Sequence, residues 1–404
     1  MPGQRDTDGA LPPVSVRPVS VPLVSVPLVS VPPVFGVSAL GPPVPGSAIG
    51  IIANPMSGRD IRRLVARASV FPNAEKTNMA LRLIAAAGAL GVERVCMSTD
   101  AMGVAAGVLR AAGKRRPRDG RWPELEFCEL ARATGDAEDT RRLVRRMRER
   151  GVAVLVLLGG DGTVRAASTD CADVPLLPLS TGTNNAFPEM WEATVAGAAA
   201  ALLATGRVTP DEATYRAKAL RVHTGGRTEA ALVDVCLSTV AHVGARALWD
   251  VGTLRELYCA FAEPHAIGLS SIAGLVAPIG RTEPDGVRVR LAGSAAAAAA
   301  AVPRQVLAPV APGVLASVGL LEVAPLRAGE PVTSALARGT VAVDGERELE
   351  FGPSSPVTVT LTPHGPVVLD VRAVLARAAE RGLLLSTPAP QQTAETDQTY
   401  QEVR

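Results

Sequence analysis

The chain has 404 residues, and its 41 basic and 39 acidic side chains leave a net charge of only +2. This length allows two domains, each with a substantial hydrophobic core. Aromatic residues make up 3% of the chain and no basic patch is interleaved with them, so a surface that binds nucleic acid by stacking its bases is not expected.

The first 46 residues differ in composition from the rest of the chain. A five-residue unit, VSVRP-VSVPL-VSVPL-VSVPP, repeats over residues 14–33. Regular proline prevents a continuous helix, and therefore a membrane-spanning helix, and it also prevents a central strand. The charged start is mixed in sign, which does not fit a signal peptide. We therefore predict that residues 1–46 are a disordered, dispensable extension and that the folded chain begins at Ala48.

The next hundred residues alternate between apolar runs typical of strands and patterns typical of helices. Such alternation predicts an α/β domain with a doubly wound parallel sheet, whose ligand-binding edge lies at the carboxyl ends of its strands. The expected strands are 49–53, 94–98 and 125–130, and the expected helices are 73–90, 101–112 and 139–150.

The last of these helices is rich in arginine. Its sequence RRLVRRMRER at 141–150 has the spacing of a solvated helix face, which we favour over a nucleic-acid-binding patch. Asp136 or Glu138 supplies acidic charge near its N-terminus, where the helix dipole stabilises such charge.

A glycine-rich loop follows a strand that is expected to be buried on both faces. Residues 152–158 form an unbroken Val- and Leu-rich run, typical of the centre of a parallel sheet. The run ends at Gly159, Gly160, Asp161, Gly162 and Thr163. The glycines allow backbone angles and close approaches that side chains would block, so the loop can fold around a phosphate, with a helix from Thr163 attracting its charge. A carboxylate in such a cradle fits phosphoryl transfer, in which Asp161 holds a metal ion or takes a proton from a nucleophile.

A second loop, TGTNN at 181–185, follows another apolar run that ends at Leu179. Since both loops follow strands of one parallel sheet, we expect them to converge on one crevice. Asn184 and Asn185 are suited to hydrogen-bonding a ligand, or to the left-handed or side-chain-bonded geometry of a turn. The segment NPMSG at 54–58, after the first strand, carries ordinary turn signals.

The pattern changes near residues 206–210, after an Ala-rich helix at 194–204. Shorter, strand-like segments between glycine-rich turns then predict a second, β-rich domain over residues 207–385. The expected strands lie at 218–223, 229–238, 286–291, 357–361 and 367–371.

The second half also contains a hairpin turn, expected at 341–346, and a final amphipathic helix, expected at 373–382. The polar residues 386–404 are predicted to be a disordered tail. The seven alanines at 295–301 fit a helix or an insertion, and we assign no role to them.

The five cysteines are scattered and include no Cys-x-x-Cys pair. This pattern predicts reduced thiols in a cytoplasmic protein, and neither a disulfide framework nor a zinc site. They are Cys96, Cys128, Cys171, Cys236 and Cys259.

The motifs, taken in this order, resemble those of the diacylglycerol, sphingosine and NAD kinase superfamily. Within it, the chain is most similar to the ATP-NAD kinase-like branch that includes the acetoin-catabolism protein X (AcoX) group, over about residues 48 to 385. The matching segments are IGIIANPMSGRDIRRLVARASVF at 49–71, LLGGDGTVRAAS at 157–168, PLLPLSTGTNNAFP at 175–188 and HVGARALWD at 242–250.

The resemblance implies an ATP-dependent kinase that phosphorylates a hydroxyl, with the adenosine 2′-hydroxyl of NAD as the expected acceptor. ATP would bind with Mg²⁺ or another divalent metal, and polyphosphate is the alternative phosphoryl donor. The protein could also form a homo-oligomer. Asp161 would activate the hydroxyl or help to place Mg²⁺. The residues expected to bind nucleotide phosphates are Gly159, Gly160, Gly162, Thr163, Asn54, Ser57 and Gly58. The residues expected to bind the acceptor are Thr183, Asn184, Asn185, Asp234 and His242, with Asp234 and His242 on the wall of a pocket between the domains.

The second half departs from the NAD kinase pattern. Where NAD kinases carry an Asn-Glu pair, this chain has Val233 and Asp234, so only the acid is kept. Residues 266–274 resemble a Gly-Ser-Thr-Ala loop of that family without reproducing it. His242 also fits a structural role among apolar neighbours, and Arg246 with Asp250 fits either an i,i+4 ion pair or a phosphate and ribose contact.

Two other functions remain open. A lipid kinase shares GGDGT and a Gly-Thr-x-Asn-x-Phe loop like residues 182–187, but it needs an apolar groove or a membrane-facing surface. A non-catalytic nucleotide sensor would keep the binding loops and lose turnover.

Overall fold

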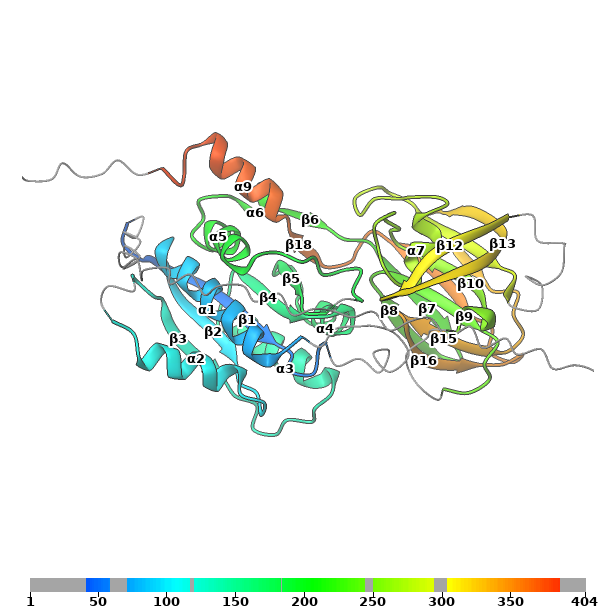
Figure 1. Ribbon diagram of the computed structural model, residues 1–404, viewed down its shortest axis with the longest axis horizontal. Helices are drawn as coiled ribbons and strands as arrows, with labels where there is room; N and C mark the ends of the chain where they lie inside the picture. The colour runs from blue at the N-terminus through cyan, green and yellow to red at the C-terminus, as the bar shows by residue number, and fades with distance from the viewer. Residues whose placement is uncertain are drawn as a thin grey trace, which may run out of the picture. The chain divides into compact units, whose positions relative to one another are not determined.

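The computed structural model describes residues 41–58, 71–116, 120–182, 184–243, 250–293 and 304–385. Within these residues, a domain built on a mainly parallel sheet is followed by a β-rich domain (Figure 1). The predictions for residues 1–40, for the alanines at 295–301 and for the tail at 386–404 lie outside the described residues.

The first sheet joins seven of the described strands. They are β1 (Val44–Ala53), β2 (Val92–Ser98), β3 (Glu124–Cys128), β4 (Val154–Gly159), β5 (Leu176–Ser180), β6 (Thr214–Arg216) and β18 (Val367–Leu369). Their order is β3-β2-β1-β4-β5-β18-β6, and all neighbours run parallel except β18 and β6.

Helices cover both faces of this sheet. They are α1 (Asn73–Ala89), α2 (Val104–Gly113), α3 (Ala137–Glu149), α4 (Asp161–Ser168), α5 (Ala193–Ala204), α6 (Pro210–Ala213) and α9 (Val371–Glu380). Successive strand residues point to opposite faces. Thus Ile49 and Ile51 of β1 pack in one apolar cluster with α1, α2, α5 and α9, whereas Ile52 packs in another with α3 and α4. The predicted doubly wound α/β domain is confirmed.

The arginine-rich helix α3 has the solvated face that its sequence predicts. Asp136 is its N-cap and accepts the N–H of Glu138 (2.9 Å). Arg145 pairs with Glu138 (2.7 Å), and Arg141 pairs with Asp170 (2.7 Å), in partly exposed positions. These arginines are therefore engaged in ion pairs along the helix surface.

The start of the folded chain lies earlier than predicted. β1 begins at Val44, whose N–H donates to the carbonyl of Gly91 (2.9 Å), and the N–H of Gly46 donates to the carboxylate of Glu93 (2.7 Å). The register with β2 shifts between Val44 and Ala48, an irregularity of the kind that accommodates a proline in a strand. The boundary predicted at residue 46 therefore falls inside β1.

The end of the folded chain returns to the first domain, which corrects the predicted second domain of residues 207–385. β18 pairs with β5 through Val368 and Leu176, and it thereby covers a strand whose backbone would otherwise form an open edge. The predicted last helix is α9, which buries Val371 and Val374 and contacts α5 and α6 (orange-red beside green in Figure 1).

The second domain contains two antiparallel sheets. Its strands are β7 (Ala219–Thr224), β8 (Arg227–Ala231), β9 (Asp234–Ser238), β10 (Leu254–Cys259), β11 (Gly286–Leu291), β12 (Arg304–Ala311), β13 (Val314–Leu326), β14 (Pro331–Thr333), β15 (Gly339–Val343), β16 (Glu346–Phe351) and β17 (Thr358–Thr362), with the short helices η3 (Val251–Thr253) and α7 (Ser270–Gly274). The strand orders are β12-β13-β11-β10-β9-β15-β16 and β14-β17-β7-β8. The predicted hairpin is confirmed: Asp344 and Gly345, with φ of 49° and 77°, turn the chain between β15 and β16.

The single strand predicted at 229–238 is instead two strands, β8 and β9. The chain leaves the strand pairing at Leu232 and Val233, and the buried carboxylate of Asp344 accepts their N–H groups (3.0 and 2.8 Å). A side chain more than a hundred positions away thus satisfies the backbone groups that a continuous strand would have paired.

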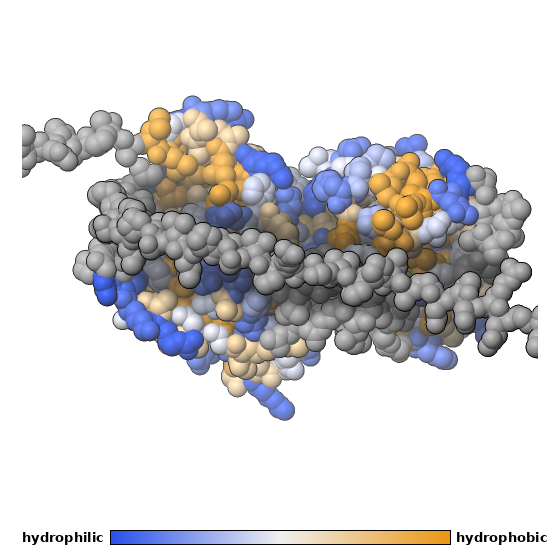
Figure 2. All heavy atoms as spheres, viewed as in Figure 1, coloured by the Kyte–Doolittle hydropathy of each residue, from blue (hydrophilic) through white to orange (hydrophobic). Residues whose placement is uncertain are grey.

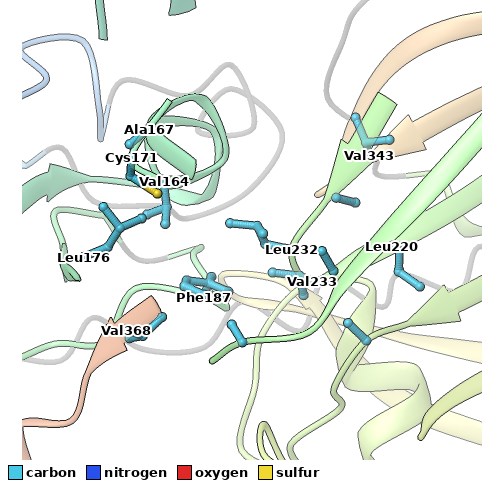
Figure 3. Close-up of a cluster of buried hydrophobic side chains, with 14 of the residues drawn as sticks. Val164, Ala167, Cys171, Leu176, Phe187, Leu220, Leu232, Val233, Val343 and Val368 are labelled. Carbon is cyan, nitrogen blue, oxygen red and sulfur yellow. The ribbon is translucent and has the colours of Figure 1, made fainter. Parts of the chain in front are cut away.

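One apolar cluster runs from the first domain into the second. Figure 3 shows Phe187 between Leu176 and Val368 of the first domain and Leu232 and Val233 of the second, all within this cluster. Because Phe187 follows the TGTNN segment, that segment is anchored where the two domains pack together.

The visible surface mixes hydrophilic and hydrophobic side chains in both domains (Figure 2). Exposed apolar side chains of the β-rich domain include Leu307, Leu315 and Leu321. Among the described helices, none has the length and apolar character needed to cross a membrane.

Candidate functional site

Loops that follow β1, β4 and β5 lie together at the carboxyl edge of the first sheet. We name them the NPMSG loop (54–58), the GGDGT loop (159–163) and the TGTNNAF loop (181–187). Asn54 donates its side-chain N–H to the Thr163 hydroxyl (2.9 Å), and the hydroxyl oxygens of Ser57 and Thr181 lie 2.7 Å apart. Gly58 has a φ of 75°, and a Cβ there would lie 2.6 Å from the carbonyl oxygen of Thr181. The expected convergence is therefore present.

None of the glycines of the GGDGT loop has a positive φ, so what two of them provide is room for close packing. A Cβ on Gly159 would lie 2.6 Å from the Thr163 side chain, and one on Gly160 would lie 2.6 Å from the Asn185 amide oxygen. Gly162 differs, because a Cβ there would have no described neighbour within 4 Å. α4 begins at Asp161, two residues before the predicted start, so Gly162 leaves open space at the first turn of this helix.

Asp161 fastens the TGTNNAF loop to the GGDGT loop. Its carboxylate accepts the N–H of Phe187 (2.8 Å) and the N–H of Ala186 (3.1 and 3.2 Å to the two oxygens). Asp161 therefore combines a structural role with a negative charge placed beside the expected phosphate site.

Lys76 is a site residue that the sequence interpretation missed. It is fully buried, and its ammonium group donates to the carbonyl oxygens of Asn54 (2.9 Å) and Ser57 (2.8 Å) and to the side chain of Asn73 (3.1 Å). A signal was available, since Lys76, Met79 and Leu83 share the helical spacing of the buried stripe of α1. A lysine among these buried positions indicates that its ammonium group bonds to backbone carbonyl groups, here those of the NPMSG loop.

Arg281 is a second missed residue, and it reaches the TGTNNAF loop from the second domain. Its guanidinium donates to the carbonyl oxygens of Phe187 and Ala186, each at 2.8 Å. Glu263 pairs with the same guanidinium at 3.1 Å. The rings of Phe261 and Phe187 lie on it, with centroids 4.4 and 5.6 Å from its central carbon.

Arg165 of the first domain connects α4 to the second domain, whereas Arg281 reaches the first domain from the second. It lies 3.7 Å from the Asp344 carboxylate and 2.9 Å from the Glu348 carboxylate. Burial alone would lower the pKa of Arg165, but the two acids raise it above its ordinary value. Burial raises the pKa of Asp344, while Arg165 and the backbone N–H groups that it accepts oppose the rise.

The structure does not bring Asp234 and His242 together, which corrects the expectation that both line one pocket wall. Asp234 is 4% exposed and begins β9 beside Asp344. His242 follows the other end of β9, is exposed and lies 3.5 Å from Glu350. It lines a cavity of about 580 Å³ formed by second-domain residues, among them Arg227 and Arg338. Thr183 and Arg246 lie outside the described residues.

All five cysteines are buried free thiols. Among the described residues, no group of three or more His, Cys, Asp or Glu side chains is arranged to hold a metal ion.

Comparisons with known proteins match both parts of the chain. The family model described as the ATP-NAD kinase N-terminal domain matches residues 49–208, and the one described as the acetoin catabolism protein X C-terminal domain matches residues 218–364. Acetoin catabolism protein X of Cupriavidus necator is 43% identical over 347 residues, which cover 85% of this chain and 95% of that protein. A crystal structure of a protein proposed to be a diacylglycerol kinase, from Bacillus anthracis str. Sterne, covers 80% of this chain and 97% of its own, with 13% identity and a TM-score of 0.38. The chain thus belongs to the acetoin catabolism protein X family, with an N-terminal domain of the ATP-NAD kinase type.

Proposed function

We propose that the protein is an ATP-dependent kinase that transfers the γ-phosphoryl group to a small-molecule hydroxyl, with the adenosine 2′-hydroxyl of NAD as acceptor. The observation that carries this proposal is the set of side-chain bonds that join the three loops, above all the bonds from Asp161 to Ala186 and Phe187. The match of residues 49–208 to the ATP-NAD kinase N-terminal domain supports ATP as donor and NAD as acceptor.

In this proposal the backbone binds the nucleotide phosphates. Gly162 leaves space beside the first turn of α4, and N–H groups at a helix N-terminus attract negative charge. Lys76 adds a buried positive charge under the NPMSG loop. The phosphate site would consist of Asn54, Ser57, Gly58, Gly159, Gly160, Gly162 and Thr163.

Asp161 is the proposed catalytic residue, and it would take the proton of the acceptor hydroxyl or help to hold Mg²⁺. Among the described residues of the three loops, Asp161 supplies the carboxylate. Mg²⁺ commonly binds one or two carboxylates together with substrate phosphates, so the ion would bind here together with ATP. When bound, the ion would neutralise charge that develops on the transferred phosphoryl group.

The acceptor is assigned to the TGTNNAF loop, with Asn184 and Asn185 and, outside the described residues, Thr183 as its proposed contacts. Asp234 is only 4% exposed, so it is left out of the proposed acceptor contacts. His242 is left out of the proposed site because it follows the opposite end of β9.

A nucleotide-binding sensor without turnover is the second candidate, and one observation favours it. Asp161 already accepts two backbone N–H groups, a structural role that its carboxylate fills even if no reaction occurs. Binding loops would persist in such a protein, since their bonds to one another do not depend on catalysis.

An acceptor screen tests the proposal. ATP and Mg²⁺ are incubated with the protein and with NAD, with a diacylglycerol, or with no acceptor, and both ADP and the phosphorylated acceptor are quantified. The kinase proposal expects NADP in the first reaction only. ATP binding without any product would favour the sensor, phosphorylated lipid would favour the lipid kinase, and a protein that fails to bind ATP would overturn all three.

A further inference from the structure

We infer that Arg281 is a positioning residue of the nucleotide site: it holds the TGTNNAF loop against Asp161 and so makes the geometry of this loop depend on the second domain. The consequence for nucleotide rests on the proposed function, whereas the contact with the loop does not.

Asp161 and Arg281 hydrogen-bond to the backbone of the same two residues, Asp161 to their N–H groups and Arg281 to their carbonyl groups. The negative carboxylate accepts the N–H groups of Ala186 and Phe187, and the positive guanidinium donates to the carbonyl oxygens of these residues at 2.8 Å. The carbonyl of Ala186 and the N–H of Phe187 belong to one peptide group, so each charge polarises this group in the sense that strengthens the bond on the other side. Removal of one charge should therefore weaken the contact made by the other.

Arginine suits this position because its planar fork offers several donors in fixed directions. Two nitrogens reach the two carbonyl oxygens, and Glu263 accepts from the guanidinium at 3.1 and 3.2 Å. The side chain is only 14% exposed and packs on the rings of Phe187 and Phe261. A lysine would keep the charge but lose the fork and the stacking.

The segment that carries Arg281 is itself fixed to the second domain. Lys218 donates to the carbonyl oxygens of Gly280 (3.0 Å) and Asp285 (2.6 Å), on both sides of Arg281. A bridge between Ala262 and Ile279 holds the preceding residues. Arg281 therefore transmits the position of the second domain to the loop.

The nucleotide site should respond because the same loop contacts the phosphate cradle. The amide oxygen of Asn185 would lie only 2.6 Å from a Cβ on Gly160, and the side-chain N–H of Asn185 donates to the Ser180 hydroxyl (2.9 Å). A loop released from Arg281 would no longer hold Asn185 against Gly160, and the cradle would lose its defined shape.

The test compares Arg281→Lys with Arg372→Lys in the full chain. Arg372 is the control, because it also stacks on an aromatic ring, Trp191 (4.7 Å), and pairs with a glutamate, Glu189 (3.0 Å). It is 70% exposed, and its described contacts do not include the backbone of residues 186–187. A double variant, Glu263→Gln with Arg281→Met, removes the tie without leaving an unpaired buried charge, and such replacements often preserve folding.

Two measurements are made on each variant: hydrogen exchange of peptides that cover residues 184–187, and the Kd for ATP by titration. In Arg281→Lys and in the double variant we expect exchange at these residues to rise by about tenfold or more and ATP affinity to fall by a similar factor, as loss of bonds to a charged group implies. Arg372→Lys should change neither.

Unchanged exchange in both Arg281 variants would overturn the inference. Faster exchange with unaltered ATP affinity would overturn its consequence for the nucleotide site. If the unaltered protein binds no ATP, the proposed function fails, and the exchange measurement still decides whether Arg281 positions the loop.

Discussion

Arg165 and Asp344 join the GGDGT helix to the turn of the β15–β16 hairpin, with 3.7 Å between the Nε of the arginine and the nearer carboxylate oxygen. Asp344 also accepts the N–H groups of Leu232 and Val233, where the chain passes from β8 to β9. The buried carboxylate of Asp344 thus accepts hydrogen bonds at a strand break in the second domain and also pairs with Arg165, four positions after Asp161. The proposed catalytic helix is therefore tied to the second domain independently of Arg281.

Replacement of Arg165 by methionine should strongly destabilise the fold. The change leaves Asp344 and Glu348, which are 2% and 18% exposed, without their shared cation. We expect the free energy of unfolding to fall by about 3–5 kcal/mol, the usual cost of breaking a buried ion pair from one side. Urea denaturation measures the change.

Arg141→Met is the control for this variant, since Arg141 makes its ion pairs with Glu138 and Asp170 on a partly exposed surface. Arg141→Met should lower the free energy of unfolding by about 1 kcal/mol or less. Equal losses in the two variants would show that the Arg165 pair adds no more than a surface pair.

Asp161→Asn should separate turnover from binding. Loss of a general base typically lowers kcat by about 10²- to 10⁴-fold, whereas ATP affinity should fall far less because the loop amides remain. The asparagine oxygen can still accept a backbone N–H, but the charge that strengthens the bonds to Ala186 and Phe187 is gone, so we expect a loss of about 1–2 kcal/mol in unfolding free energy. Kinetics with a demonstrated acceptor, together with thermal unfolding, test both parts. A folded variant with near-normal kcat would leave Asp161 as a structural residue only.

Two alanine substitutions in the GGDGT loop should have opposite effects on stability. Gly160→Ala places a Cβ 2.6 Å from the amide oxygen of Asn185, so this side chain must shift, its bond to Ser180 should weaken and the Tm should fall. Gly162→Ala meets no described atom within 4 Å and lies in a helix, where alanine is favoured over glycine by about 1 kcal/mol. Its Tm should therefore hold or rise.

Because the fold of the Gly162→Ala variant should be intact, a change in its ATP affinity reflects the contact with the ligand alone. If phosphate occupies the space beside Gly162, the added methyl group should weaken ATP binding although the fold is intact. Full ATP affinity in this stable variant would place the phosphates elsewhere.

Lys218 should make stability depend on alkaline pH. Burial lowers its pKa from 10.5 to about 8, against the raising effect of Glu283 and Asp285. Between these two values the unfolded chain binds more protons at this position than the folded protein does, and stability from this group therefore rises with pH. It is fully present above 10.5 and is lost as the pH falls through about 8.

The measurement compares unfolding free energies of the unaltered protein and of Lys218→Met from pH 7 to pH 11. Groups common to both proteins cancel in the difference, which should change in favour of the unaltered protein as the pH rises from about 8 to 10.5. A difference that stays flat across this range would mean that Lys218 keeps an ordinary pKa in the folded protein.

Local patterns in the sequence were sufficient for most of the elements and for the place of the candidate site. The apolar run at 152–158 predicts a central strand because both faces of a parallel sheet are buried, and β4 occupies that position. Asp344-Gly345 predicts a tight turn because both positions tolerate a positive φ. Since strands of a parallel sheet end at one edge, the order of the motifs placed the GGDGT and TGTNNAF loops together, and the family resemblance added the NPMSG loop.

Only the tertiary structure decided which distant side chains complete the site. Arg281 and Phe187 are 94 positions apart, and Arg165 and Glu348 are 183 positions apart. No periodicity or turn signal encodes such pairs, because they depend on how the two domains pack and on the return of β18 and α9 to the first sheet. Proline near the start of β1 and a strand-like pattern at 229–238 led to wrong boundaries for the same reason. Pairing with β2 and the carboxylate of Asp344, both remote in sequence, outweighed local preference.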